Sequence, residues 1–137
     1  MKVLYFSRDY SPHDERFLTA LARTSHEVYF LRLDPSRAVD LPAGIVEVQL
    51  DSSTFPVPVE MHSAAQTLRR LVDDLKPDVV HAGPLHGPGY TAALAGITPL
   101  ASMSWGSDIL HEARVNPQAK RRITRTLAAS TILIADC

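Results

Sequence analysis

With 137 residues, of which 45% are hydrophobic, the chain can bury one ordinary core, and this length favours a single domain. Its formal net charge of −1 gives no reason to expect attraction to nucleic acid, so nucleic acid is not among the expected partners. The single cysteine, Cys137, excludes an intrachain disulfide, and the sequence shows neither an N-terminal signal nor an apolar run of the roughly 18 residues of a membrane span. These features predict a soluble cytoplasmic protein.

The chain opens with a strand followed by a helix. Lys2–Phe6 is a short apolar run of β-prone residues, and a polar loop at residues 7–10 follows it. Residues 11–14, with the sequence SPHD, form a capping-box pattern around a proline, which predicts a helix that runs to about Thr24. This order of strand, tight polar loop and helix is typical of the start of a Rossmann-like domain.

Two further strands are predicted next, Glu27–Leu33 and Ile45–Leu50. The segment 34–44 between them carries two prolines and a glycine, which indicates a loop. A parallel crossover needs about a dozen residues or more, so the third strand fits either a parallel strand or an antiparallel edge. Residues 51–58 have the composition of a Ser/Thr/Pro linker.

The middle of the chain predicts a helix, a strand, a helix and a strand. Apolar residues at helical spacing mark Met61–Leu75 as the clearest amphipathic helix, ended by Pro77. Asp78–His81 is the fourth predicted strand. A small-residue helix follows at residues 87–95, and Pro99–Ser104 is the fifth strand.

The last part of the chain predicts one more helix and one more strand. Asn116 and a proline after it start a helix that continues to Ser130, with four residues facing inward: Ala119, Ile123, Leu127 and Ala128. Thr131–Ala135 reads as a sixth strand of the buried type. Because the sequence stops two residues later, it looks interrupted, and we expect a further domain.

Polar residues gather at one edge of this predicted sheet. The first and fourth strands should be neighbours where the strand order reverses, so the loops 7–11 and 81–87 flank one crevice, with the turn 105–108 next to them. Carboxylates and imidazoles hydrogen-bond sugars, and an indole face packs on a pyranose ring, so the set suits a hydroxyl-rich ligand. The candidate substrate-binding residues are Asp9, His13, His81, His86, Gly87, Trp105, Gly106 and Asp108.

Several of these residues have a structural alternative. His81 fits a hydrogen-bonded structural histidine as well as a substrate contact, and Asp108 fits the cap of a turn. Asp14 fits a helix cap better than a ligand group. The helix that opens at Gly87 has no acid in its first turn, so we expect it to be the better anion site.

Other kinds of site are disfavoured. His81 and His86 lack the Cys or carboxylate spacing that would accompany them in a metal site, so no metal is expected. The loop after the first strand has no G-x-G-x-x-G, which argues against a nicotinamide cofactor. The cluster at residues 120–125, KRRITR, indicates a solvated helix face, with peripheral membrane contact or a phosphate-binding patch as the alternatives.

Three stretches together carry a resemblance to a known family. They are the opening strand at residues 1–4 (MKVL), residues 76–82 (KPDVVHA) and residues 105–108 (WGSD). In this order they resemble the N-terminal domain of family 4 (group 1) GT-B glycosyltransferases, and the resemblance covers essentially the whole chain.

The resemblance implies an α/β fold: a Rossmann-like three-layer domain with a mostly parallel sheet, one half of a GT-B fold. Residues 1–137 would be the acceptor-side domain, and the C-terminal nucleotide-sugar domain is absent from this chain. The implied reaction is a retaining sugar transfer from a nucleotide-sugar donor to a glycosyl acceptor, with the donor as co-substrate and no other cofactor. The domain would be inactive alone, and its own C-terminal domain would be its partner.

Residue by residue, His81 matches the family's strand-four histidine, and Gly106 and Asp108 match its H-G-x-D turn. Trp105 stands where a histidine often precedes that glycine, and the paired glycines of the family's first loop are missing from residues 7–11. No acidic E-x7-E element of the C-terminal domain is present. The alternatives are a GT-B relative that epimerises or hydrolyses a nucleotide sugar, and a stand-alone flavodoxin-like binding module.

Overall fold

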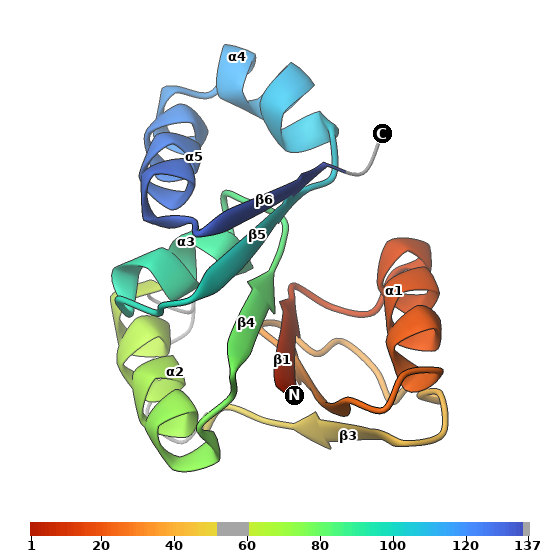
Figure 1. The fold of residues 1–137 in the computed structure, drawn as a ribbon. Coiled ribbons are helices and arrows are strands. Elements are labelled where there is room, and N and C mark those ends of the chain that lie inside the picture. The colour runs from red at the N-terminus through yellow and green to blue at the C-terminus, as the bar shows by residue number, and fades with distance from the viewer. Residues whose placement is uncertain (52–60, 136–137) are drawn as a thin grey trace.

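The computed structural model describes residues 1–51 and 61–135, in which helices separate all successive strands except β2 and β3 (Figure 1). The predicted linker at 51–58 lies almost entirely outside the described residues. The strands are β1 (Lys2–Ser7), β2 (Glu27–Arg32), β3 (Ile45–Val48), β4 (Val79–Ala82), β5 (Leu100–Ser104) and β6 (Ile132–Ala135). The helices are α1 (Pro12–Ala22), α2 (Met61–Leu75), α3 (Pro88–Leu94), the short π-helix η2 (Asp108–Glu112), α4 (Ala113–Val115) and α5 (Pro117–Ala129).

All the described strands join one parallel sheet in the order β3-β2-β1-β4-β5-β6. β1 pairs with both β2 and β4, which confirms that the first and fourth strands are neighbours where the strand order reverses. β3 pairs in parallel with β2, with Val28 opposite Ile45, so the direction that the sequence left open is parallel. The α/β prediction with a mostly parallel sheet is therefore confirmed.

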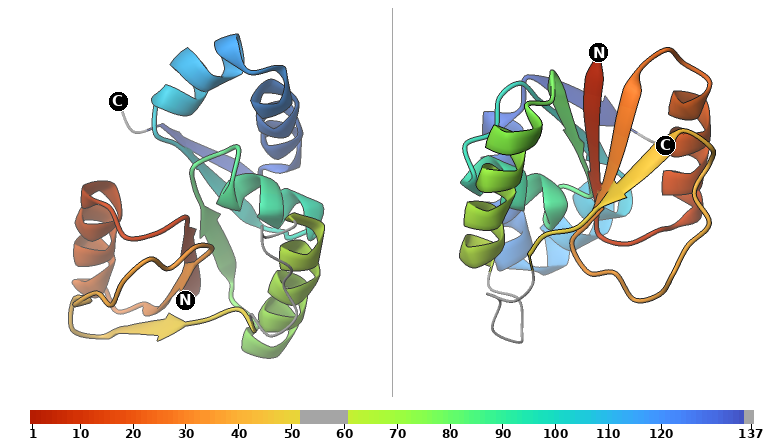
Figure 2. Two further views of the ribbon diagram at one scale, coloured as in Figure 1. Left: turned by 180° about the vertical axis from the view of Figure 1, so that it is seen from behind. Right: turned by 90° about the horizontal axis from the view of Figure 1, so that it is seen from below.

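Helices cover the two faces of the sheet unequally. α1 lies on one face, and α2, α3 and α5 lie on the other (Figure 2). The alternation along β1 explains why both faces have a core: Leu4 and Phe6 pack in the cluster that includes Leu68 of α2, while Tyr5 packs with Leu18 of α1. The result is the three-layer arrangement that the sequence predicted.

The helix starts follow from their capping residues. At α1 the Ser11 backbone N–H donates to Asp14 at 2.8 Å, and the Asp14 N–H donates back to the Ser11 hydroxyl at 3.4 Å, which completes the predicted capping box. At α5 the Asn116 side chain accepts from two backbone N–H groups of the first turn, with Pro117 in the first helical position.

Two predictions about burial near the end of the chain are wrong. Leu127 is 37% exposed and Ala128 is exposed as well, whereas Thr126 is fully buried because its hydroxyl donates to the Leu85 carbonyl at 2.8 Å. The sixth strand is an edge strand rather than a buried one, with Ile132 56% and Leu133 50% exposed. Within the described ranges, no helix is both long enough and apolar enough to cross a bilayer.

Candidate functional site

The loop after β4 and the turn after β5 meet at the carboxyl edge of the sheet, because their strands are parallel neighbours. The fully buried carboxylate of Asp108 joins them: it accepts from the Leu85 N–H at 3.0 Å and from the Ser104 hydroxyl at 2.7 Å. The chain's own donors thus occupy Asp108, and this favours a positioning role for it.

Two glycines shape this junction. Gly106 has φ = +81°, a left-handed conformation that glycine adopts without strain, and its N–H donates to the Ser104 hydroxyl at 3.1 Å. A Cβ on Gly83 would lie 2.8 Å from the Met103 carbonyl oxygen, so only glycine lets the β4 loop approach β5 this closely. Gly87 caps α3 without a side-chain hydrogen bond, and α3 has only 7 residues.

His81 lies in an aromatic surrounding on the α1 face of the sheet. Its ring centroid is 4.8 Å from that of Tyr5 and 5.6 Å from that of Phe17, and both contacts are edge-on. The side chain is 8% exposed, and burial lowers the pKa of His81 from its ordinary 6.5 to about 4. The imidazole is therefore neutral near pH 7.

Four buried polar atoms of the described residues find no hydrogen-bond partner in the chain. They are Ser7 Oγ, His81 Nε2, His86 Nδ1 and Trp105 Nε1. Buried polar atoms are nearly always paired in native proteins, so a group of unpaired ones calls for an explanation. All four belong to the carboxyl-end part of β1 or β4, or to the loops that follow β4 and β5, which makes this edge the best candidate for a polar ligand.

Trp105 links the β5 turn to α1. Its ring stacks on the His13 ring with the centroids 5.2 Å apart and the planes 19° from parallel. His13 belongs to the first helical turn of α1, and Asp14 fixes the position of that turn. The Tyr5 hydroxyl donates to the Asp14 carboxylate at 3.1 Å. Asp14 is thus fully used as a cap, in agreement with its structural interpretation.

A charged network includes Asp9, which lines the same cavity as Trp105. The buried Arg32 guanidinium pairs with Asp9 at 2.9 Å and with Glu47 at 2.6 Å. Hydrogen bonds from Ser36 and from Arg32 hold the pKa of Asp9 below its ordinary value. A cavity of about 310 Å³ opens here, and its lining residues are Arg8, Asp9, Tyr10, Ser11, Asp34, Ser36 and Trp105.

The structure places the predicted site residues on β4 and on the segments that follow β1, β4 and β5, toward the carboxyl edge of the sheet. Asp9 lines the same cavity as Trp105, and His13 stacks on it. His86 and Gly87 belong to the β4–α3 loop, which Asp108 ties to the same edge. Among the described residues, no group of three or more His, Cys, Asp or Glu side chains could hold a metal ion.

Sequence reasoning missed Ser7 and Arg32. Ser7 is the last residue of β1 and is 1% exposed, although the prediction placed it in the polar loop. The sequence signal for Arg32 is an arginine inside an otherwise apolar strand. A buried cation needs acidic partners, so this position indicates a charged network around the strand.

The sequence matches the family model described as "Glycosyl transferase 4-like" over residues 2–137. No curated protein sequence matches the chain. Three similar solved structures are described as UDP-N-acetylglucosamine 2-epimerases, the first of them provisionally. The Listeria monocytogenes structure has a TM-score of 0.64 and 12% identity, and the match covers 98% of this chain and 38% of that one.

The structure from Methanocaldococcus jannaschii has a TM-score of 0.61 and 15% identity, with coverage of 100% and 40%. The Neisseria meningitidis structure, bound to UDP-GlcNAc, has a TM-score of 0.51 and 16% identity, with coverage of 95% and 39%. The chain therefore spans about two fifths of the length of these structures. At these identities the likeness concerns the fold.

Proposed function

Because the chain belongs to the glycosyl transferase 4-like family and has the fold of one half of a GT-B protein, we propose that it is the acceptor-side domain of a glycosyltransferase. The reaction would transfer a sugar, with retention, from a nucleotide-sugar donor to a glycosyl acceptor. A second domain would hold the nucleotide sugar, and the domain described here would be inactive without it.

The observation that carries this proposal is the group of unpaired polar atoms at the carboxyl edge of the sheet. A hydroxyl-rich acceptor molecule offers both hydrogen-bond donors and acceptors. The indole N–H of Trp105 needs an acceptor, whereas the hydroxyl of Ser7 and the imidazole nitrogens of His81 and His86 can pair with a sugar hydroxyl in either role. Leaving such groups unpaired costs about 1–3 kcal/mol each, so a ligand that pairs them gains that free energy on binding.

The residues divide into contacting and positioning groups. Trp105 and His86 would contact the acceptor, and the neutral imidazole of His81 would hydrogen-bond a hydroxyl instead of pairing with a phosphate charge. Asp108 would hold the two loops in place. Catalysis of this kind depends on orientation and on stabilising the departing nucleotide, and the second domain would supply most of the groups for the latter.

The test uses the full-length polypeptide that contains this chain. It is incubated with nucleotide-sugar donors, UDP-GlcNAc among them, with and without a library of glycosyl acceptors, and the products are separated by chromatography. We expect a new glycoside that forms only when an acceptor is present. Epimerised or hydrolysed sugar that forms equally well without an acceptor would assign the chain to the epimerase alternative.

Variants of the site test the residue roles. Trp105→Ala and His86→Ala should each lower kcat/KM for the acceptor while the circular dichroism spectrum stays unchanged. Thr124→Ala, at an exposed position of α5, serves as the control and should leave kcat/KM unchanged. Transfer at the wild-type rate by both site variants would remove these two residues from the site.

A further inference from the structure

The charges of this chain are divided unequally along the sequence. Residues 113–135 contain five cations and no Asp or Glu, whereas the whole chain has 14 Lys and Arg and 15 Asp and Glu. The cations of this segment are Arg114, Lys120, Arg121, Arg122 and Arg125. A chain of net charge −1 thus contains one strongly basic segment, while its remaining part is acidic.

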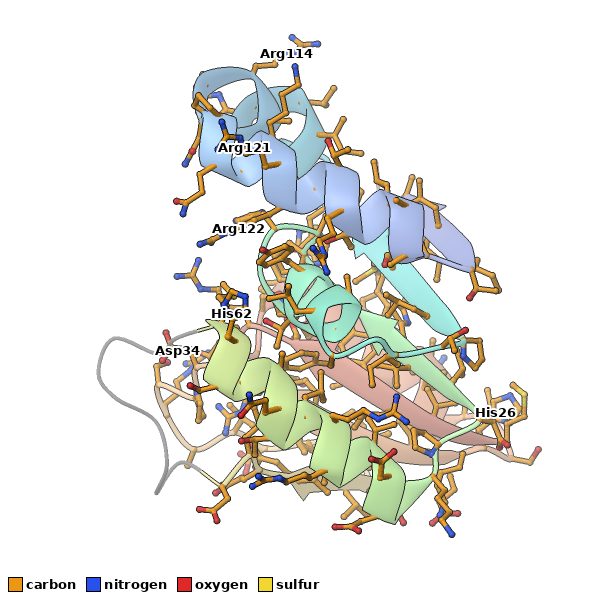
Figure 3. The ribbon with its side chains drawn as sticks, turned by 90° about the vertical axis from the view of Figure 1, so that its left-hand side faces the viewer. His26, Asp34, His62, Arg114, Arg121 and Arg122 are labelled. Atoms are coloured by element: carbon orange, nitrogen blue, oxygen red, sulfur yellow. The ribbon has the colours of Figure 1, made fainter. Side chains whose placement is uncertain are left out.

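This basic segment follows directly on exposed aliphatic side chains. Leu110 of η2 is 62% exposed and Val115 of α4 is 63% exposed, and Ile109 beside them is 39% exposed. We call η2, α4 and the first two turns of α5 the basic corner. Figure 3 shows Arg114 and Arg121 of this corner pointing outward from its helices, while Arg122 lies nearer to α3.

Not every cation of the segment is free for a partner. The Arg122 guanidinium lies over the Tyr90 ring, 5.5 Å from its centroid, and that side chain is half-buried. Arg114, Lys120 and Arg121 are exposed. Glu112 is the acid nearest to them in sequence, and it is half-buried in η2. The outward surface of the basic corner therefore combines aliphatic side chains with an excess of positive charge.

We propose that the basic corner docks on an anionic lipid surface, with Leu110 and Val115 at the boundary between headgroups and acyl chains. Arg114, Lys120 and Arg121 would then lie against lipid phosphates. Interfacial segments combine apolar side chains with Lys and Arg in this way, and each cation near an anionic leaflet strengthens the binding. Single-stranded nucleic acid fits the corner less well, because proteins that bind single strands without sequence preference stack the bases on aromatic rings, and the exposed apolar residues of this corner are aliphatic.

The topology sets the orientation of the docked domain. The basic corner connects the end of β5 to the start of α5, so it lies at the carboxyl edge of the sheet, as Trp105 does. Docking would therefore bring the candidate site close to the lipid surface. The proposal rests on charge and exposure alone and does not depend on the glycosyltransferase assignment.

The test measures binding of the full-length polypeptide to sedimented vesicles. One set of vesicles is phosphatidylcholine alone, and the other contains phosphatidylglycerol as well. We expect binding to the anionic vesicles only. The double variant Lys120→Ser/Arg121→Ser should weaken it about thirtyfold, since each cation contributes about 1 kcal/mol and 1.4 kcal/mol is a factor of ten. Leu110→Ser/Val115→Ser should weaken binding at high salt as well, where the contribution of charge is screened.

Matched controls remove the same groups elsewhere. Arg69→Ser/Arg70→Ser deletes two exposed cations of α2, and Val46→Ser deletes an aliphatic side chain of β3 that is 51% exposed. Both should bind as the wild type does. Lys120→Arg/Arg121→Lys keeps the charge and should keep the affinity, which separates a charge effect from misfolding.

Three results would overturn the proposal. The first is equal binding to neutral and anionic vesicles. The second is equal loss of binding in the control variants and the corner variants. The third is that the protein binds single-stranded nucleic acid and no vesicles, and that the corner substitutions abolish this binding. That result would assign the surface to nucleic acid instead.

Discussion

The buried imidazole of His81 predicts a loss of stability in acid. Burial lowers the pKa of His81 in the folded protein to about 4, below its ordinary 6.5, so the unfolded chain takes up the proton more readily between these two pH values. The stabilisation is therefore complete above about pH 6.5 and is lost progressively as the pH falls toward about 4. One pKa unit corresponds to about 1.4 kcal/mol, so the free energy of unfolding should fall by about 2 kcal/mol between about pH 7 and about pH 4.5 from this group alone.

The assay is urea unfolding of the 137-residue chain across this pH range, followed by far-UV circular dichroism. His81→Asn replaces the imidazole with a polar group that does not titrate, so the stability of this variant should fall with pH by about 2 kcal/mol less than that of the wild type. His62→Asn, at an exposed position of α2, should keep the wild-type slope. Parallel curves for the wild type and His81→Asn would refute the reasoning, because they would show that His81 takes up its proton equally well in the folded protein.

Two further predictions concern the junction at the sheet edge, and urea unfolding measures both. Asp108→Ala should lower the free energy of unfolding by about 3 kcal/mol, because it leaves the buried N–H of Leu85 without an acceptor. The control Asp78→Ala removes an acceptor from the exposed N–H of Lys2 and should lower it by less than about 1 kcal/mol. Equal losses in the two variants would count against the buried junction. A Cβ on Gly89 would lie 2.9 Å from Thr126 Cγ2, so Gly89→Ala should lower the free energy of unfolding by about 1–3 kcal/mol. Adding Thr126→Ser removes that methyl group, keeps the hydroxyl and should recover part of the lost stability. No recovery would show that the strain lies elsewhere.

Much of the fold follows from local sequence signals. The proline and glycine positions separate the strands from the helices, and the capping box at Ser11 marks the first residue of α1. The direction of β3 does not follow, because a connection of this length permits both a parallel and an antiparallel neighbour, and pairing with β2 decides between them. The prediction that Leu127 of α5 faces inward was wrong for a related reason. Helical periodicity favours Leu127, whereas the burial of Thr126 depends on a hydrogen bond to a carbonyl 41 residues away in the sequence.

The candidate site was predictable in its place and less so in its details. The strand order brings the loops after β1, β4 and β5 to one edge, and polar residues in those loops can be read from the sequence. Whether a polar atom there already has a partner depends on distances across the fold. Asp108 is occupied by the chain's own donors, whereas the hydroxyl of Ser7, a residue that no sequence pattern singles out, is buried and unpaired.

The stacked pair of Trp105 and His13 gives this domain a built-in optical reporter. The chain contains one tryptophan, and that indole lines the cavity beside Asp9 while its face covers the imidazole on α1. Its ultraviolet emission therefore originates at the candidate site and nowhere else in this chain. A molecule that enters between the loops changes the polarity around the fluorophore directly, so occupancy can be followed in solution without attaching a dye.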